Sequence, residues 1–440
     1  MDMTAEYRAF ENDLITHSVM LDRNKCKGCT SCIKRCPTEA IRVRDGHAYI
    51  ENNRCIDCGE CIRACQYKAK KAIYDRFEDF ADYKYKIALP APALYGQFEE
   101  VNDLDAVLSA LVEIGFDEVF EVARAAEMVS EYTRKYFERN DSLPSPVISS
   151  ACPVIVRLIS IRYPLLLDNV LPVMPPIEVA ARVARKEAIE KHPELTDDDI
   201  CVLFISPCPA KVSYVKNPIG VEKTAVNGVL SIGEFFFKMR SAMKTMKEEK
   251  VQAQSGIIGI SWAGTSGEAS ALFNEKYLAA DGIENVIKVL DEIDNGNIRN
   301  LDFVELNACN GGCVGGVLNV ENPYIAKARL QTLRRYLPVS LNRLGTTRLE
   351  SYEWDQLPEP ESVMQLSNNR QEAMRMMRDI VALTEKLPGI DCGSCGAPTC
   401  RAFAEDIVKG RAVIDDCLFV MRDKLLKQCA DLEKNNEGET

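Results

Sequence analysis

Cysteines are the residues of this chain with the most obvious capacity for chemistry, because they make up 18 of its 440 residues. Two dense runs lie in the first 65 residues, three separate motifs lie between residues 149 and 313, and a last group begins at residue 392. Soft thiolate ligands select iron-sulfur clusters or zinc over harder ions. Since the spacings are those of metal sites and not of a disulfide framework, we expect most of these thiols to hold metal centres.

The two N-terminal runs share the spacing C-x2-C-x2-C-x3-C. In two-cluster proteins with this spacing, the fourth cysteine of each run binds the cluster of the other run. The spacing therefore predicts two 4Fe-4S centres. Their ligands would be Cys26, Cys29, Cys32 and Cys65 for one centre, and Cys55, Cys58, Cys61 and Cys36 for the other. A zinc ribbon is the alternative, and two tandem runs of four cysteines disfavour it.

The segment between the two runs predicts a β-hairpin, because residues 40–50 alternate in polarity and turn at Asp45-Gly46. With the cluster spacing, this pattern makes residues 19–75 resemble a bacterial-type two-cluster ferredoxin domain. The resemblance implies a small α+β fold.

Three central motifs offer four more thiolates, the number that a cubane iron-sulfur cluster requires. They read SSACP at 149–153, SPCPAK at 206–211 and ELNACNGGC at 305–313. Each follows a short apolar run that is typical of a parallel strand buried on both faces, and these runs are residues 147–148, 200–205 and 303–306. Because ligand sites lie beyond the carboxyl ends of such strands, we expect the four thiols to surround one pocket. They belong to Cys152, Cys208, Cys309 and Cys313.

Further patterns around these motifs predict a large α/β unit. Apolar runs at 85–89 and 257–260 predict two more buried strands, and helical periodicity covers 103–114 and 125–137. Glu127 and Glu131 lie on the second of these helices, where a solvated carboxylate is the expected role and a proton relay is the alternative.

The central motifs resemble those of the catalytic domain of FeFe hydrogenases, over about residues 80–345. The patterns of that family are T-S-C-C-P, M-P-C-x-x-K and E-x-M-A-C-x-x-G-C. Its cysteines bind a 4Fe-4S cube joined to a diiron unit that carries carbon monoxide, cyanide and a bridging dithiolate, together called the H-cluster. The resemblance implies a two-lobed α/β domain with parallel sheets flanked by helices. It also implies an oxygen-sensitive cofactor, supplied by hydrogenase maturation proteins.

The resemblance assigns roles to individual residues. Cys152, Cys208, Cys309 and Cys313 would bind the cube, and Cys313 would also bridge to the diiron unit. Lys211 matches the family lysine that hydrogen-bonds a cyanide ligand. Two further stretches resemble backbone that lines the cofactor pocket: Ala91-Pro92-Ala93 and Gly264-Thr265-Ser266-Gly267.

This chain departs from the family pattern at three positions that face the cofactor. The proton-shuttling first cysteine of C-C-P is Ala151, whose methyl group cannot act as an acid or base. The family methionines are replaced by Ser206 and Asn307, which make the surroundings more polar and should shift the cluster potential. The family serine before a proline is most nearly matched by Met174-Pro175. These changes resemble the sensory branch of the FeFe hydrogenases, which keeps the ligands but lacks the shuttle.

A separate metal site is expected near the C-terminus. Residues 349–367 are a predicted linker, and 369–387 a predicted helix that Pro388-Gly389 ends. Cys392, Cys395, Cys400 and Cys417 follow with a spacing that resembles the small 4Fe-4S domain of corrinoid proteins and of the Rnf complex. A zinc site is the alternative. The resemblance implies a small helical domain that serves for docking or signal output.

The remaining composition limits the choice of partners. A net charge of -12 argues against nucleic acid or anionic lipid. No apolar run is long enough for a membrane span or a signal peptide, so we expect a cytoplasmic protein. No phosphate-binding glycine loop is present. Cys201 is expected to be a core residue, and Cys429 lies on a charged terminal helix, so neither needs a ligand role. The three histidines, His17, His47 and His192, are expected to be surface or structural residues.

These observations predict an α/β multidomain protein. The expected divisions are an N-terminal segment (1–18), the ferredoxin domain (19–75), the H-cluster domain (80–345), a linker with a helix (346–378) and the C-terminal 4Fe-4S domain (379–440). The expected function is a hydrogen or redox sensor with slow conversion of hydrogen and protons, exchanging electrons with ferredoxin or a signalling partner. The alternatives are a slow ferredoxin-linked hydrogenase and a non-catalytic iron-sulfur protein for electron transfer or cluster assembly.

Overall fold

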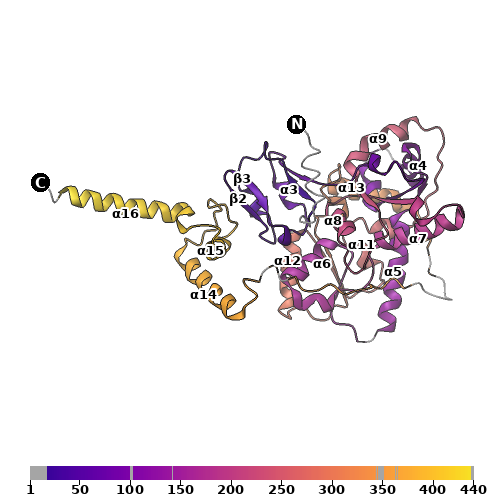
Figure 1. Ribbon diagram of the computed structural model, residues 1–440. Helices are drawn as coiled ribbons and strands as arrows, with labels where there is room; N and C mark the ends of the chain where they lie inside the picture. The colour runs from indigo at the N-terminus through magenta and orange to yellow at the C-terminus, as the bar shows by residue number, and fades with distance from the viewer. Residues whose placement is uncertain are drawn as a thin grey trace.

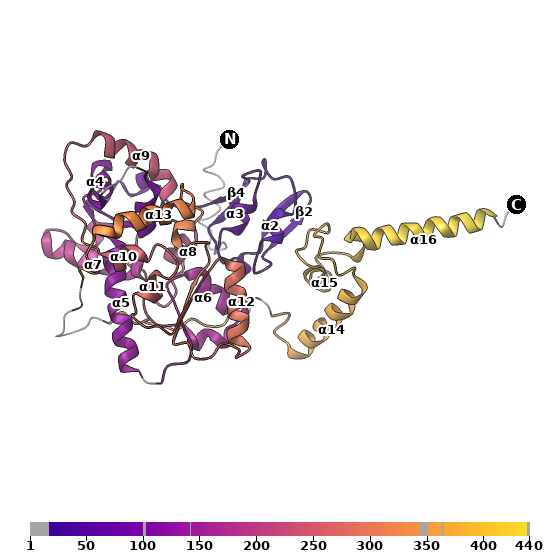
Figure 2. The same cartoon turned by 180° about the vertical axis from the view of Figure 1, so that it is seen from behind.

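The computed structural model describes residues 17–99, 103–140, 142–342, 344, 351–361, 363 and 365–437. Most of the predicted N-terminal segment and the start of the predicted linker lie outside these residues. In Figures 1 and 2 the N-terminal cysteine-rich part lies between a large α/β part and a helical C-terminal part. None of the described helices is both long and apolar enough to cross a membrane.

The N-terminal part consists of two antiparallel strand pairs and two short helices. Strand β1 (Val19–Leu21) pairs with β4 (Lys70–Ala72), and β2 (Ile41–Arg44) pairs with β3 (His47–Ile50). The helices are α2 (Ser31–Lys34) and α3 (Glu60–Ala64). Asp45 and Gly46 have φ angles of 50° and 73°, the left-handed conformation that a two-residue hairpin turn requires. The predicted hairpin is therefore confirmed.

Two separate parallel sheets organise the large part. The first has the order β6-β5-β8-β9, and the second has the order β10-β11-β7. The strands of the first sheet are β5 (Tyr85–Pro90), β6 (Glu118–Val119), β8 (Ile200–Ser206) and β9 (Gly228–Ser231). Those of the second are β7 (Val147–Ile148), β10 (Tyr277–Asp281) and β11 (Phe303–Asn307). All pairings are parallel, which confirms the two-lobed α/β prediction.

Helices cover these sheets because the strands are apolar on both faces; every residue of β8 is buried. The α-helices of the large part are α4 (Leu104–Ile114), α5 (Val122–Arg139), α6 (Pro153–Arg162), α7 (Pro176–Lys191), α8 (Ala210–Lys216), α9 (Ile232–Thr245), α10 (Ile257–Ser261), α11 (Gly267–Ser270), α12 (Ile283–Asp294) and α13 (Pro323–Leu333). Short 3-10 helices of the chain are η1 (Asn52–Arg54), η2 (Phe77–Phe80), η3 (Pro92–Gln97), η4 (Pro164–Asn169), η5 (Asp197–Asp199), η6 (Cys313–Gly315), η7 (Arg334–Tyr336) and η9 (Ile414–Asp416).

One predicted strand is wrong, because residues 257–260 form part of helix α10. A short apolar run has no periodicity that separates a buried strand from a buried helical turn. Here the packing decides the outcome. Gly259 lies so close to α5 that an added Cβ would approach the backbone oxygen of Ala123 to 2.2 Å.

The C-terminal part contains three helices: α14 (Arg370–Lys386), α15 (Cys400–Val408) and α16 (Leu418–Glu437). Asn369 caps α14 by accepting hydrogen bonds from the backbone N–H groups of Gln371 and Glu372, which confirms the predicted helix start. Buried side chains of Ile380, Phe403 and Cys417 form a small core of this part's own. Figure 1 shows α16 projecting away from the rest of the molecule.

The described part of the predicted linker packs on the large part. The N–H of Met174 donates to the carbonyl of Tyr352, and the N–H of Trp354 donates to the carbonyl of Pro172. Tyr352 is buried as a result. Residues 351–355 therefore behave as a strap across the α/β unit.

Candidate metal centres

The four central cysteines line one cavity of about 110 Å³, which lies between the two parallel sheets. Cys152 lies between β7 and α6, just before the first residue of α6, and Cys208 follows β8. Cys309 lies in the loop after β11, and Cys313 begins the short helix η6 that follows this loop. All four are thus placed beyond the carboxyl ends of strands, as expected for a ligand site in parallel α/β proteins.

Burial governs the chemistry of these thiols. It raises the pKa of Cys309 to about 12, and it raises the pKa of Cys208 and of Cys313 as well. Mutual repulsion among the sulfurs adds to the effect. Three thiols with raised pKa values are thiolates only beside a strong positive charge, which a coordinated metal supplies. The donor set therefore fits an iron-sulfur cube.

Lys211 is the cation of this cavity. Its side chain comes from α8, lines the cavity, and donates a 3.1 Å hydrogen bond from Nζ to the carbonyl of Ala151. Burial lowers the pKa of Lys211, while the thiols of Cys208, Cys152 and Cys313 oppose that shift. The residue thus stands where it can meet an anionic ligand of a bound group.

A buried pair of carboxylates in the cavity wall was missed by sequence reasoning. Glu268 and Glu305 both line the cavity. Burial raises the pKa of each, and the charge of Glu305 raises the pKa of Glu268 further. Ser149 donates a 2.6 Å hydrogen bond to Oε2 of Glu268 and accepts one of 3.2 Å from the N–H of Ala151. An acid that tends to stay protonated therefore lies one hydroxyl away from the Ala151 backbone.

The other residues expected to touch the cofactor fall into two groups. Ala91, Pro92 and Ala151 form part of the wall, and Asn307 joins them by donating to Glu305 over 2.7 Å. Ala93 and Ser206 are absent from the described lining. Ser206 instead accepts a hydrogen bond from the N–H of Cys208 and donates to its carbonyl, so it shapes the turn that carries this thiol.

The Gly264–Gly267 stretch lines a neighbouring cavity and contacts the loop between Cys309 and Cys313. The N–H of Thr265 donates to the carbonyl of Gly311 over 3.1 Å. Gly312 has a φ of 89°, and a Cβ there would lie 2.6 Å from the nitrogen of Thr265. This approach requires glycine at position 312.

The expectation that Glu127 is a solvated carboxylate is wrong. It is buried, and its oxygens accept hydrogen bonds from the backbone N–H groups of Gly256, Leu341 and Asn342. Glu131 pairs with Lys135 and accepts from the N–H of Leu344. Both carboxylates fasten the chain around residues 340–344, and neither lines the cysteine cavity.

The first N-terminal cysteine set lines one small cavity together, although Cys65 is far from the others in sequence. The members are Cys26, Cys29, Cys32 and Cys65. In the second set, burial raises the pKa of Cys58 and of Cys61, and the nearby thiol of Cys36 raises both pKa values further. Backbone N–H groups of Ala40 and Ala69 donate 3.2 Å bonds to the sulfurs of Cys36 and Cys65. Hydrogen bonds of this kind tune cluster potentials.

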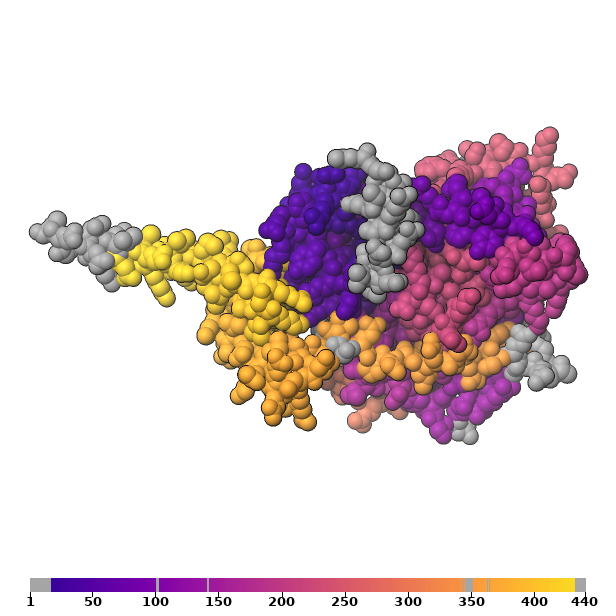
Figure 3. Space-filling model, in the orientation of Figure 1, coloured from indigo at the N-terminus to yellow at the C-terminus, as the bar shows by residue number. Residues whose placement is uncertain are grey.

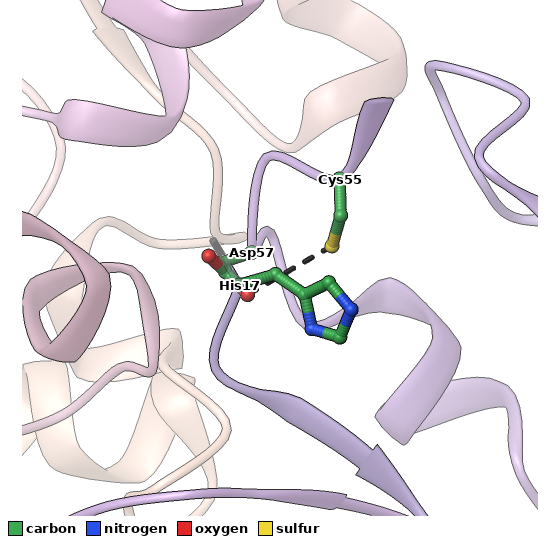
Figure 4. A group of neighbouring side chains, drawn as sticks. All are labelled: His17, Cys55 and Asp57. Atoms are coloured by element: carbon green, nitrogen blue, oxygen red, sulfur yellow. Dashed lines mark hydrogen bonds between the residues drawn. The ribbon is translucent and has the colours of Figure 1, made fainter. Parts of the chain in front are cut away.

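His17, expected to be a surface or structural residue, is buried beside the second cysteine set. Figure 4 shows its ring near Cys55 and Asp57, with the Cys55 thiol directed at the Asp57 carboxylate. Asp57 is already bonded to the N–H of Ser18, the hydroxyl of Ser213 and the guanidinium of Arg157. The group therefore joins the N-terminal part to the large part, and the described contacts give it a structural role.

The second cysteine set adjoins the cavity of the four central cysteines. Cys58 is part of the cavity wall, and Arg63 of α3 donates a 3.2 Å hydrogen bond to the sulfur of Cys309. Gly59 lies against Val317, where an added Cβ would meet the side chain at 2.8 Å. This side of the N-terminal part is thus in direct contact with the loop that carries two of the four central thiols.

The C-terminal cysteines also gather around one place. Cys395, Cys400 and Cys417 belong to, or pack against, the same small core. Burial raises the pKa of Cys395, and the nearby thiols of Cys417 and of the exposed Cys392 raise it further. The two remaining cysteines, Cys201 and Cys429, do not belong to any of these cysteine groups among the described residues. Cys201 is fully buried in β8, as predicted, and Cys429 is exposed on α16.

Comparison with known proteins supports these assignments at the level of families. Residues 84–274 and 238–317 match the family described as iron only hydrogenase large subunit, C-terminal domain, so more than half of the chain is covered. Residues 18–66 match a 4Fe-4S dicluster domain, and residues 387–419 match a family described as an Fe-S cluster. The chain therefore belongs to the family of the iron-only hydrogenase large subunit.

Individual relatives are distant. Iron hydrogenase 1 of Clostridium pasteurianum is 24% identical over 307 residues, which cover 56% of this chain and 52% of that protein. The chain thus spans about half the length of this relative. The corrinoid/iron-sulfur protein large subunit of Moorella thermoacetica is 47% identical over 36 residues, 8% of each chain. An apo variant of the FeFe-hydrogenase HydA1 from Chlamydomonas reinhardtii has 17% identity and a TM-score of 0.46, covering 60% of this chain and 87% of that one.

Proposed function

We propose that this protein holds an H-cluster in the cavity of the four central cysteines and acts as a hydrogen or redox sensor with slow hydrogen conversion. One observation carries the proposal: the cavity joins four thiols and a buried lysine. From the family resemblance we infer that Ala151 stands at the position of the proton-shuttling cysteine. Family membership supports iron-sulfur chemistry in general. The sensing role is our inference from the side chains that are present.

When bound, the H-cluster would supply the iron that binds hydrogen and exchanges electrons. Cys152, Cys208, Cys309 and Cys313 would hold it, with Cys313 as the bridging ligand. Lys211 would orient it by donating from Nζ to a cyanide ligand. The apolar wall, including Phe204 and Trp262, would exclude water. These tasks need no proton transfer, so the loss of the cysteine at position 151 leaves them intact.

Slow conversion follows from the proton side of the site. A positioned acid or base contributes about 10² to 10⁴ in rate, and the methyl group of Ala151 contributes nothing of this kind. Glu268 is a group of the wall that can hold a proton, on Oε1 or Oε2, and the hydroxyl of Ser149 donates to it. We propose that it serves as a less direct replacement. Hydrogen binding would then be preserved while turnover is limited.

The electron side of the proposal uses the two ferredoxin-type centres and the C-terminal centre. Cys58 and Arg63 bring the second cysteine set to the large cavity. The proposed partners are hydrogen and protons, ferredoxin or a signalling protein, and the maturation proteins that would deliver the diiron unit. We propose a cytoplasmic location and no nucleic-acid partner.

Two alternatives give different expectations for the same protein. A slow ferredoxin-linked hydrogenase would sustain turnover with reduced ferredoxin, whereas a non-catalytic electron-transfer or assembly protein would hold cubes without a diiron unit. Lys211 and Cys313 favour the presence of the diiron unit, because they stand at the positions of the family lysine that hydrogen-bonds a cyanide ligand and of the family's bridging cysteine.

The proposal is tested by comparing binding with turnover on one preparation. Protein loaded with cubes and the diiron precursor is exposed to hydrogen and then to argon, while infrared bands and hydrogen evolution are recorded. We expect bands that change reversibly at low hydrogen pressure together with slow evolution. Fast evolution with reduced ferredoxin would instead establish the metabolic hydrogenase.

A further inference from the structure

The C-terminal part lies against the β2–β3 hairpin of the N-terminal part, on the side away from the cavity of the four central cysteines. Figures 1 and 2 both show α15 beside β2, and Figure 3 shows the two parts in contact. The backbone N–H of Val43 donates a 2.8 Å hydrogen bond to the carbonyl of Gly396. The guanidinium of Arg44 donates to the carbonyl of Cys395 over 2.5 Å. The loop of the C-terminal cysteines therefore touches β2 directly.

A buried ion pair holds this contact together. Nε of Arg42 lies 2.7 Å from Oδ2 of Asp406, and the two side chains are 1% and 3% exposed. Arg44 contacts the same carboxylate at 3.0 Å. Removing one member of such a pair leaves an uncompensated buried charge and is strongly destabilising. The pair therefore acts as a specific clamp between two parts of the chain.

Further polar contacts, two of them between opposite charges, surround the clamp. Arg54 of the N-terminal part contacts Glu405 at 2.5 Å, and Arg411 of the C-terminal part contacts Glu51 at 2.9 Å. Lys34 donates to the carbonyl of Pro398 over 3.3 Å. Since both sides contribute backbone and side-chain partners, the interface is built to fix orientation as well as proximity.

The clamp places the C-terminal cysteines next to one particular cysteine set. Val43 lines the small cavity of Cys26, Cys29, Cys32 and Cys65, and its backbone is the one bonded to Gly396. Gly396 follows Cys395 directly and has a φ of 78°, and a Cβ on it would approach the oxygen of Val43 to 1.9 Å. Glycine thus permits the closest approach of the two loops.

The C-terminal part has no comparable contact with the large part among the described residues. A cavity of about 990 Å³ separates Glu372 and Met376 of α14 from Arg157 and Ile161 of α6. The described route from the C-terminal cysteines to the cavity of the four central cysteines therefore runs through the N-terminal part. Along this route the two N-terminal sets are neighbours, since Cys32 of one set and Cys61 of the other lie in the same buried cluster, with Cys26 and Cys36 packed against it.

We propose that the Arg42–Asp406 clamp fixes the C-terminal centre beside the centre of Cys26, Cys29, Cys32 and Cys65, in position to exchange single electrons with it. Each exchange would oxidise one centre by one electron and reduce its neighbour by one, with no change of bonds or protons. The centres would then form a series, held by the C-terminal set, the Cys26 set, the Cys36 set and the central cysteines. This rests on the proposed iron-sulfur occupancy and is independent of whether the protein senses or turns over hydrogen.

The test measures magnetic coupling between reduced centres by electron paramagnetic resonance in the full chain loaded with cubes. The clamp variant is E405Q combined with D406N, and the matched control is D423N, which removes an exposed carboxylate paired with Arg422 on α16. Hydrogen exchange of residues 41–44 reports docking, and iron and sulfide analysis reports loading.

We expect coupling of the C-terminal centre in the wild type and in the control. In the clamp variant we expect this coupling to be lost, with at least tenfold faster exchange at residues 41–44 and unchanged iron content. Coupling that persists in the undocked variant would overturn the proposal, as would a fully loaded wild type whose C-terminal centre is magnetically isolated. A misfolded variant is recognised by its iron loss; the single variant D406N, which keeps the shape of the side chain, then provides the same comparison. Missing diiron bands would refute the proposed function and leave this result unaffected.

Discussion

The hydroxyl of Ser149 donates a 2.6 Å hydrogen bond to the buried carboxylate of Glu268. This contact joins the residue two positions before Ala151 to a group that can carry a proton in the same cavity wall. It places a side chain that can hold a proton in the cavity wall, next to the residue that bonds to the backbone of Ala151. We propose that the proton chemistry of the site depends on Glu268, which lies outside all of the cysteine motifs.

Replacing Glu268 with glutamine tests this role. We expect E268Q to lower the rate of isotope exchange between deuterium gas and water by about 10² or more, because glutamine cannot accept and release the proton. The infrared bands of the loaded protein should remain. The control E284Q changes an exposed glutamate on α12, whose partner is Arg35. Equal exchange rates in E268Q and wild type would rule Glu268 out as the replacement group.

The same carboxylate predicts a pH dependence of stability. Burial raises its pKa in the folded protein above the ordinary value of 4.5, so the folded state binds more protons than the unfolded state above that pH. The stability from this group is thus fully present below pH 4.5 and is lost as the pH rises through the raised pKa, with a slope of about 1.4 kcal/mol for each pH unit. Denaturant unfolding of cube-loaded wild type and E268Q at pH 5 and above should show wild type losing more; parallel curves would contradict the burial argument.

Restoring the missing thiol should increase activity. We expect Ala151→Cys to raise hydrogen evolution by about 10² or more, because it returns a positioned acid to the cavity. The measurement is turnover per diiron unit, normalised by infrared intensity. The variant S150C offers a control thiol one residue away. No gain in a fully loaded A151C protein would mean that proton delivery does not limit the rate.

Lys211 should be needed for the diiron unit and not for the cube. In K211M the ammonium that donates to Ala151 is lost while the four thiols stay in place. We therefore expect weakened or absent carbon monoxide and cyanide bands with unchanged cube iron. The exposed Lys223 supplies the control K223M. Full band intensity in K211M would show that the lysine does not help to hold the group.

Arg63 should tune the cube in the central cavity. Its guanidinium donates to the sulfur of Cys309, and hydrogen bonds to cluster sulfurs stabilise the reduced, more negative state. We expect R63Q to shift the cube potential to a more negative value in a redox titration followed by electron paramagnetic resonance. R23Q, at an exposed position, is the control. An unchanged potential would indicate that the contact is not made when the cube is bound.

Sequence reasoning reached the cysteines because ligand spacing is local, and it reached the parallel strands because both of their faces are apolar. It failed for residues 257–260, where a short apolar run is a helix. Glu127 and Asp406 look like surface acids in the sequence, yet both are buried by partners far away in the chain. Glu268 was missed for the same reason. Such contacts depend on how the lobes pack, which no single motif encodes.

The central claim is that the cavity of the four cysteines holds a diiron unit bridged through Cys313. The most direct measurement is anaerobic infrared spectroscopy of wild type and C313S, both loaded with cubes and treated with the diiron precursor. We predict bands of metal-bound carbon monoxide and cyanide in the wild type, and their absence in C313S. A wild type with complete cubes and no such bands would contradict the claim and favour an electron-transfer or assembly role.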